Sequence, residues 1–464
     1  MTLDTPLAPK PGTPAPSAVP APLRHEAETR RYRARTPGSL REWERARTRV
    51  PFGVGTNFRI MDPYPLYLRS ARGSRIEDVD GNVYVDWALG QTTMLTGHAH
   101  PAVLAAARRQ MEHGTLTCFP GPLLDRLAEV VCERFRLETV RFVNTGSEAV
   151  FYPLRVARAA TSRDKVLKFD TCYHGSSPEF LQGKATANLR PGNPAWLAEA
   201  LWTNGLPKAF TDLTVVADYN DLDSVRACFR ENPGQIAAVV VEPVGLNLGV
   251  LVPRTGFLQG LRDICDREGA VLIFDEVKVG CKLGPLGAGE YFGVTPDLVA
   301  MAKSIGGGFP IGLFGGRADL MRQIETGGVA HVGTYSANPL SLAASLATLT
   351  EVLTPETYDR IFATARALAD GYREIVRRTG IDAHVVNIGA SGCLFLSRGQ
   401  PFSRADFLRG RHEVWPIFWY GMLNRGVMVQ GHGPEDGWTV SAQHTEEDVE
   451  ASLRAFREVA PLLA

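Results

Sequence analysis

Several features that would assign a function quickly are absent from this chain of 464 residues. Its seven cysteines are scattered, odd in number and free of CxxC spacing, which argues against a disulfide framework and against a zinc ribbon. No metal site is expected, and a reducing, cytoplasmic setting is favoured. No apolar run approaches the roughly 18–20 residues that cross a bilayer. The first residues also lack the basic start and apolar stretch of a signal peptide, so neither a membrane nor secretion is expected.

An excess of charge of one sign is absent too. Lys+Arg and Asp+Glu each total 50, and neither a basic stripe nor an acidic tail is visible. Nucleic acid is therefore not an expected partner. Lysine itself is scarce, because it supplies only eight of the fifty basic residues. A coding preference for arginine accounts for this scarcity, but a lysine retained in an uncharged stretch then suggests amine chemistry.

What the sequence does contain is the composition of a well-cored globular protein. Hydrophobic residues make up 44% and charged residues 22% of the chain. The length exceeds one average domain of roughly 100–200 residues, so two or three structural units are expected. Residues 1–22 contain seven prolines among alanine, threonine and serine. Such a stretch cannot bury enough apolar surface to offset its ordering entropy, so residues 1–25 are predicted to be a disordered tail.

The order of the predicted elements indicates an α/β fold. Residues 65–88 predict a hairpin with its turn at Asp80-Gly81-Asn82. From about residue 100, short apolar runs alternate with helical segments, which is typical of a buried parallel sheet with helices on both faces. These runs lie at residues 140–143, 166–169, 236–242, 270–276 and 298–301. We therefore predict a large domain of residues 96–345 and a smaller domain from both chain ends, residues 26–95 and 346–464.

Lys303 is the first candidate for chemistry. It lies in the stretch LVAMAKSIGGGFPIGLFGG, and no other charged residue occurs between Asp297 and Arg317. Desolvation lowers the pKa of an amine, and a neutral lysine is the nucleophile that Schiff-base formation needs. A surface lysine beside a flexible glycine run gives the same pattern, so the sequence alone leaves both interpretations open.

Polar residues stand at the carboxyl ends of three apolar runs. Asp275 and Glu242 end two of them, and Tyr173-His174-Gly175 follows the third after a short linker. Ligands of open parallel sheets bind at that edge. A buried carboxylate such as Asp275 needs a cationic partner, which a protonated pyridine nitrogen provides, as does an arginine. Tyr173 suits stacking on a planar ring, although a buried core tyrosine is the commoner case.

Lys278 and Lys282 are rival amines near Asp275. Lys278 lies an odd number of positions after Asp275, so on a continuing strand its side chain would point to the opposite face of the sheet. The pattern therefore favours Lys303, rather than Lys278, as the amine that shares a site with Asp275.

The segment Thr145-Gly146-Ser147-Glu148 stands between a predicted strand and a predicted helix. Thr-x-x-Glu is a capping box, which as a plain helix start needs no ligand. Free N–H groups at a helix N-terminus and the hydroxyl of Ser147 also attract phosphate. Both interpretations fit the sequence.

Taken together, the ordered motifs resemble those of class III aminotransferases, which are pyridoxal-phosphate (PLP) enzymes of fold type I. The likeness extends over about residues 50–460 and includes the branch of glutamate-1-semialdehyde aminomutase and its aminotransferase relatives. The motifs are NTGSEA (144–149), YHG (173–175), VVVEPVGLNLGV (239–250), LIFDEV (272–277), AKSIGGGFPIGLFGG (302–316), GTYSANPLSLAA (333–344) and SAQHTEED (441–448).

The resemblance implies a fold and a cofactor. The fold is a large domain with a mostly parallel seven-stranded sheet beside a small α+β domain from both termini, and the cofactor is PLP. Lys303 is implied to form the Schiff base and to move the proton, and Asp275 to hold the pyridinium nitrogen. Gly146 and Ser147 are implied to bind the phosphate.

Further contacts follow from the same resemblance. Cofactor contacts are implied for Tyr173, which stacks on the ring, and for His174 and Glu242. Thr334 is implied to reach the phosphate of a second subunit, so a homodimer is expected. Arg59, in the segment FGVGTNFR, is nominated as the partner of the substrate carboxylate, because arginine pairs with carboxylates in a bidentate manner. A surface arginine is the other interpretation of that position.

Several positions depart from the family pattern. Lys278 stands where relatives have a small or hydroxyl residue, and Cys281 lies where an aromatic residue is usual. Leu246 and Ala337 replace smaller residues. These departures concern the substrate, which the sequence leaves open.

The expected reaction transfers an amino group between an amino acid or amine and a keto or aldehyde acceptor. The nearest alternative is an aminomutase, which moves the amino group within one carbon skeleton. A PLP racemase or decarboxylase, and a binding protein without cofactor, are the remaining interpretations.

Overall fold

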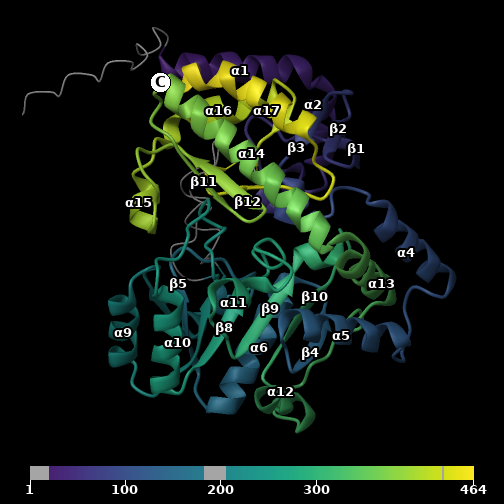
Figure 1. Cartoon of the computed structure of the whole chain (residues 1–464), viewed down its shortest axis with the longest axis vertical. Helices are drawn as coiled ribbons and strands as arrows, with labels where there is room; N and C mark the ends of the chain where they lie inside the picture. Colours follow the sequence, from purple (N-terminus) through teal and green to yellow (C-terminus); the bar gives the residue numbers. More distant parts are fainter. Residues whose placement is uncertain (1–19, 182–204, 431–432) are drawn as a thin grey trace, which may run out of the picture.

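The computed structural model describes residues 20–181, 205–430 and 433–464, which form two domains (Figure 1). Most of the predicted tail, residues 1–25, lies outside the described residues. Helix α1 (Ala21–Arg35) nevertheless begins at Ala21, so the prediction that residues 21–25 are disordered is wrong. Pro22 lies in the first turn of α1, where a residue without an N–H group is tolerated, so proline content alone did not mark the end of the tail.

Seven strands form the main sheet of the larger domain, in the order β4-β10-β9-β8-β7-β5-β6. Their bounds are β4 (Thr139–Val143), β5 (Lys165–Phe169), β6 (Thr214–Ala217), β7 (Ile236–Val241), β8 (Val271–Asp275), β9 (Leu298–Ala302) and β10 (Gly312–Gly316). Strands β6, β5, β7, β8 and β9 pair in parallel, whereas β10 is antiparallel to both β4 and β9. The predicted α/β fold with a mostly parallel seven-stranded sheet is confirmed.

Two of these strands, β6 and β10, lie outside the apolar runs found in the sequence. Strand β10 reads GLFGG, and glycine is normally depleted in strands because it has no side chain to pack. Its glycines allow neighbouring backbones to approach closely. A Cβ added at Gly315 would lie 2.3 Å from the Thr139 carbonyl oxygen, and one at Gly316 would lie 2.2 Å from that of Asp297.

Helices cover both faces of this sheet. Every residue of β7, β8 and β9 is buried, as expected for strands with two covered faces. Val239 and Leu272 join one core cluster, and the next residues along, Val240 and Ile273, join another. The first cluster contains residues of α9 (Leu222–Glu231) and α10 (Phe257–Glu268), and the second contains residues of α6 (Gly146–Thr161) and α12 (Ala318–Glu325).

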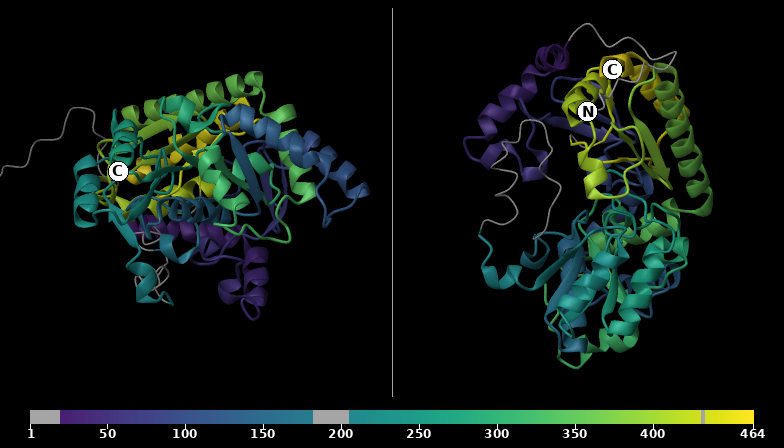
Figure 2. Two further views of the ribbon diagram at one scale, coloured as in Figure 1. Left: turned by 90° about the horizontal axis from the view of Figure 1, so that it is seen from below. Right: turned by 90° about the vertical axis from the view of Figure 1, so that its left-hand side faces the viewer.

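The smaller domain is built from both ends of the described chain. The N-terminal helices and the C-terminal helix lie at the same end of the molecule, in purple and yellow (Figure 2). One sheet joins β1 (Leu68–Arg72), β2 (Arg75–Asp78) and β3 (Val83–Asp86) to β13 (Val427–Met428), and another joins β11 (His384–Ile388), β12 (Ser391–Phe395) and β14 (Trp438–Thr439). The predicted hairpin is confirmed, because β2 and β3 pair antiparallel around residues 79–82.

The remaining larger helices complete the two domains. They are α2 (Pro37–Ala46), α4 (Pro101–Glu112), α5 (Pro122–Phe135), α13 (Pro339–Ala347), α14 (Pro355–Thr379), α16 (Trp415–Leu423) and α17 (Glu446–Val459). Among the helices that the structure describes, we find none with the length and apolar character needed to cross a membrane.

Candidate active site

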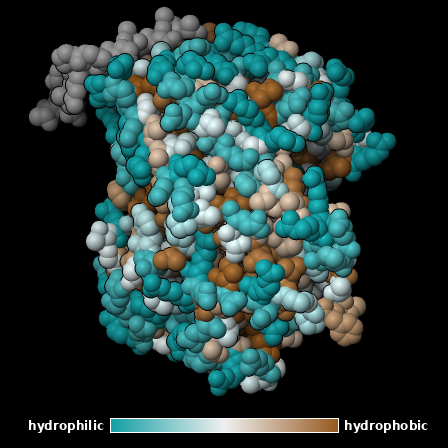
Figure 3. Space-filling model, turned by 45° about the vertical axis from the view of Figure 1, so that its right-hand side comes forward, coloured by the Kyte–Doolittle hydropathy of each residue, from teal (hydrophilic) through white to brown (hydrophobic). Residues whose placement is uncertain are grey.

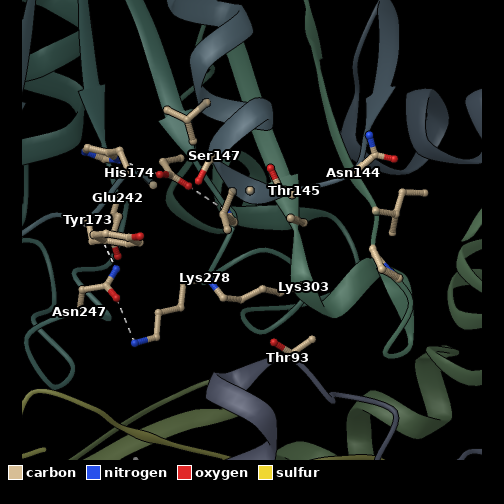
Figure 4. Close-up of a pocket in the computed structure, with 18 of the residues that line it drawn as sticks. Thr93, Asn144, Thr145, Ser147, Tyr173, His174, Glu242, Asn247, Lys278 and Lys303 are labelled. Atoms are coloured by element: carbon tan, nitrogen blue, oxygen red, sulfur yellow. Dashed lines mark hydrogen bonds and ion pairs between the residues drawn. The ribbon is translucent and has the colours of Figure 1, made fainter. Parts of the chain in front are cut away.

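A cavity of about 330 Å³ lies at the carboxyl ends of the central strands, between the two domains (Figure 4). It brings together seven residues that the sequence singled out: Gly146, Ser147, Tyr173, His174, Glu242, Asp275 and Lys303. They lie at or just after the carboxyl ends of five strands, β4, β5, β7, β8 and β9. This position matches the general rule that open parallel sheets bind ligands where their strands end.

Lys303 directly follows β9 and projects into this cavity (Figure 4). Its backbone has a φ of 51°, a left-handed conformation that non-glycine residues rarely adopt and that often occurs at functional sites. Burial lowers the pKa of the Lys303 amine from 10.5 to about 8, and the positive charge of Lys278 acts in the same direction. A substantial part of the amine is therefore neutral near pH 8, as a nucleophile requires.

Asp275 is the last residue of β8 and is only 2% exposed. Both of its carboxylate oxygens have partners: Oδ2 lies 2.6 Å from His174 Nδ1, and Oδ1 accepts a hydrogen bond of 2.9 Å from the Val277 N–H. His174 is fully buried behind the carboxylate, and its Nε2 has no hydrogen-bond partner among the described residues. The pair thus fixes the orientation of one carboxylate at the edge of the cavity.

The N-terminus of α6 also lines the cavity. The predicted capping box is confirmed, because Thr145 Oγ1 accepts from the Glu148 N–H and the Glu148 carboxylate accepts from the Thr145 N–H. A Cβ at Gly146 would lie 2.7 Å from Val277 Cγ1. The Ser147 hydroxyl accepts a bond of 3.1 Å from the Ser176 N–H.

Gly175 lets its loop approach Ser147 closely at the start of α6. Its φ is 93°, and a Cβ there would lie 2.5 Å from Ser147 Oγ, so only glycine fits. The result is a cradle of N–H groups and a hydroxyl at the positive end of a helix, which suits a phosphate group.

Glu242 follows β7 and anchors the loops around the cavity. Its Oε1 accepts from the Tyr173 N–H at 2.8 Å and from the Asn247 amide at 2.6 Å. Burial raises the pKa of Glu242, and the negative charge of Asp275 adds to that effect. Glu242 therefore holds the backbone of Tyr173. The ring of Tyr173 also packs perpendicular to that of Phe58, at a centroid distance of 5.5 Å.

Lys278 lies in the same cavity as Asp275 and Lys303, so the prediction that it points to the opposite face is wrong. Strand β8 ends at Asp275 and the chain turns immediately, so strand alternation no longer applies at Lys278. The sequence also gave no sign of Asn247 or Thr93, which line the cavity. Thr93 comes from the smaller domain and faces Lys303 across the cavity (Figure 4).

Two nominated residues lie elsewhere. Arg59 is exposed and lines a second cavity, of about 540 Å³, together with Phe58 and Trp419. This cavity adjoins the first one through the contact between Phe58 and Tyr173. Thr334 is exposed and lies outside the cavity that contains Lys303 of its own chain.

The features of the first cavity together fit one type of cofactor. A helix N-terminus suits a phosphate, a fixed buried carboxylate suits a protonated ring nitrogen, and a partly neutral lysine amine suits an aldehyde. These are the groups of PLP, and the site is of the kind found in PLP enzymes of fold type I.

Comparison with known proteins supports the assignment to PLP enzymes. The family model of class-III aminotransferases matches residues 59–439. Glutamate-1-semialdehyde 2,1-aminomutase 2 of Brevibacillus brevis is 38% identical over 415 residues, which are 88% of this chain and 94% of that protein.

Solved structures show the same relationship. An omega-transaminase from Sphaerobacter thermophilus has a TM-score of 0.84 at 33% identity, covering 92% of this chain and 98% of its own. A glutamate-1-semialdehyde aminomutase variant from Pseudomonas aeruginosa, in complex with PMP, has a TM-score of 0.86 at 28% identity, covering 96% of this chain and 98% of its own. The chain belongs to the class-III aminotransferase family and is a PLP-dependent enzyme.

Proposed function

We propose that this enzyme transfers an amino group from an amino acid or amine to a keto or aldehyde acceptor, with Lys303 as its catalytic amine. The observation that carries the proposal is that the Lys303 amine and the Asp275 carboxylate line one cavity at the N-terminus of α6. An amine, an anion and a phosphate cradle thus line the same cavity.

Each residue has a definite task in this proposal. Bound PLP supplies an aldehyde that condenses with amines and a ring that accepts the electron pair of a broken C–H bond. Lys303 would remove the substrate proton and return one to the carbon on the other side of the amino nitrogen, which its lowered pKa permits. Asp275 keeps the ring nitrogen protonated, and His174 orients Asp275.

The remaining contacts bind and orient the cofactor. Gly146 and Ser147 hold the phosphate at the start of α6, where the orphan N–H groups point into the cavity. Tyr173 covers the ring, and Glu242 fixes the backbone of Tyr173. Arg59, the cation of the adjoining cavity, remains our candidate partner for a substrate carboxylate.

The test of the proposal is Lys303→Ala. This variant is expected to lose both turnover and the borohydride-reducible imine with PLP, measured by absorbance and by mass spectrometry. Lys208→Ala is the matched control, because Lys208 is an exposed lysine that pairs with Asp212 on the surface. Normal turnover in Lys303→Ala would exclude Lys303 as the catalytic amine.

An aminomutase is the second candidate, because the relative from Brevibacillus brevis carries that name. The two reactions differ in the fate of the nitrogen. Incubation with an isotope-labelled amine and an unlabelled acceptor separates them: a transaminase passes the label to the second molecule, whereas an aminomutase keeps it on the original skeleton. A panel of amino acids, each scored by the conversion of bound PLP to its amino form, identifies the donor.

We further propose that the enzyme is a cytoplasmic homodimer in which Thr334 completes the site of the neighbouring subunit. Near Thr334 in the chain, Val332 and Tyr335 are 78% and 61% exposed, and Phe119 is 82% exposed. The Asn338 amide donates to the Thr115 carbonyl, which ties the two segments together. Hydrophobic residues also reach the surface in the lower half of Figure 3. Exposed apolar side chains of this size support a subunit interface.

A further inference from the structure

Lys278 occupies a wall of the cavity and connects three separate loops. Its Nζ donates to the Leu246 carbonyl at 2.5 Å, to Asn247 Oδ1 at 3.2 Å and to Asp436 Oδ1 at 3.4 Å. An ammonium group has three donors, so these acceptors satisfy Lys278 fully. The side chains of Lys278 and Asp436 are both almost completely buried, at 5% and 7% exposure.

The Lys278–Asp436 pair joins the two domains. Lys278 follows β8 of the larger domain, and Asp436 precedes β14 of the smaller one. The neighbouring residue Glu435 accepts a backbone hydrogen bond from Gly249, which fixes the segment against the loop after β7. A buried ion pair with a fixed geometry keeps its charges close to the cavity, because water cannot screen them as it does at the surface.

Four ionisable groups act on the Lys303 amine. Asp275, Glu242 and Asp436 are acids and favour its charged form, whereas Lys278 is an amine and disfavours that form. A further amine, Lys282, has no carboxylate partner among the described residues, and burial lowers its pKa well below the ordinary range. It donates to the Lys278 carbonyl and, at 3.0 Å, to Ser304 Oγ. Of these two amines, Lys278 is the one that lines the cavity of Lys303 and pairs with a carboxylate.

We propose that Lys278 and Asp436 form a positioning pair that sets the charge state of the amine at Lys303. Lys278 holds that amine in its neutral form, and Asp436 limits the effect by neutralising part of the charge of Lys278. The pair also fixes Asn247 and, through it, Glu242 and the backbone of Tyr173. The inference rests on the proposed function, in which Lys303 is the reactive amine.

The experiment titrates the imine absorbance of the holoenzyme against pH for four variants. Lys278→Met removes the cation and is expected to raise the titration midpoint by about one pH unit. Asp436→Asn removes the anion that favours the charged form and is expected to lower the midpoint. The double variant is expected to lie closer to the original protein than either single variant, and Lys278→Arg to retain the original midpoint.

Lys278→Met and Asp436→Asn are expected to shift the titration midpoint in opposite directions. A charge effect gives such opposite shifts, whereas loss of structure does not. Lys208→Met is the matched control, since it removes a lysine from an exposed ion pair and is expected to leave the midpoint unchanged. If Lys278→Met and Asp436→Asn move the midpoint in the same direction, or neither moves it, the inference is wrong. If Lys278→Met does not fold, Asp436→Asn still tests the inference, because its midpoint must lie below that of the original protein. An original protein that forms no reducible imine with PLP would instead reject the proposed function itself.

Discussion

At the scale of single residues, the chemistry depends on how burial changes an ordinary amine. Lysine in water is almost entirely protonated at neutral pH. At position 303 desolvation favours the neutral form, while Asp275 opposes that effect. The two influences leave a pKa of about 8, which provides a usable fraction of nucleophile and still allows the group to carry a proton.

The lowered pKa of Lys303 predicts how the rate of imine formation depends on pH. Because the folded-state pKa lies below 10.5, the neutral amine accumulates as the pH rises through about 8. The rate at which the apoenzyme forms an imine with added PLP is therefore expected to rise between pH 6 and 8 and to level off above about 8.5. Stopped-flow absorbance measures this rate. A rate that continues to rise to pH 10 would show that Lys303 keeps the ordinary lysine pKa.

Asp275 gives a second prediction at this scale. Asp275→Asn preserves the shape and one acceptor oxygen, but it removes the negative charge that stabilises a protonated ring nitrogen. The variant is expected to bind PLP and to react on the order of 100-fold more slowly, as for the loss of one charge-stabilising group in other enzymes. PLP absorbance and single-turnover kinetics measure the two properties separately. Turnover at the original rate would mean that another group faces the ring nitrogen.

At the scale of elements, the site depends on where strands stop and where one helix starts. The α6 N-terminus has no room for larger residues, because a Cβ at Gly146 would clash with Val277 and a Cβ at Gly175 would clash with Ser147. The local sequence predicts the helix start, since the capping box is a pattern of four residues. It does not predict these contacts, which join residues far apart in the chain.

Gly146→Ala tests this cradle. The added Cβ would lie 2.7 Å from Val277 Cγ1, so either Val277 or the start of α6 must shift and the fit of the phosphate is disturbed. PLP affinity is expected to fall about tenfold, which corresponds to 1.4 kcal/mol. Equilibrium dialysis measures the affinity, and denaturant unfolding of the apoenzyme shows whether stability changes as well. Gly399→Ala is the control, because a Cβ there meets no atom within 4 Å. Unchanged affinity in Gly146→Ala would show that the cradle does not hold the phosphate.

Lys278 shows how element boundaries limit inference from sequence. The alternation of side chains holds along β8, where the residues divide correctly between two core clusters. It fails after Asp275, because the strand ends there and the backbone turns. A boundary error of a few residues therefore reversed the predicted direction of a cavity residue.

At the scale of the whole molecule, the site is shared between parts of the chain that are distant in sequence. Thr93 and Asp436 come from the two chain ends, and Lys278 and Lys303 come from the middle. The proposed dimer extends this sharing to a second subunit.

Tyr335→Asp tests the proposed dimer. Tyr335 is 61% exposed, so its replacement costs little within one chain, but a charge in an apolar interface is unfavourable. The variant is expected to sediment as a monomer and to bind PLP more weakly, because Thr334 no longer reaches the neighbouring site. Analytical ultracentrifugation measures the assembly. If the original protein and the variant sediment alike, residue 335 does not lie in an essential interface.

The sequence by itself determined the α/β class, the parallel strands, the capping box and the residues at the strand ends. These features depend on short-range patterns of apolar residues, polar residues and turns, which a linear chain displays directly. Only the tertiary structure decided that Lys278, Asn247 and Thr93 share the cavity of Lys303 and that Arg59 lines the cavity beside it. The reason is physical: burial, charge and close approach at a site depend on distances between residues that the order of the chain does not contain.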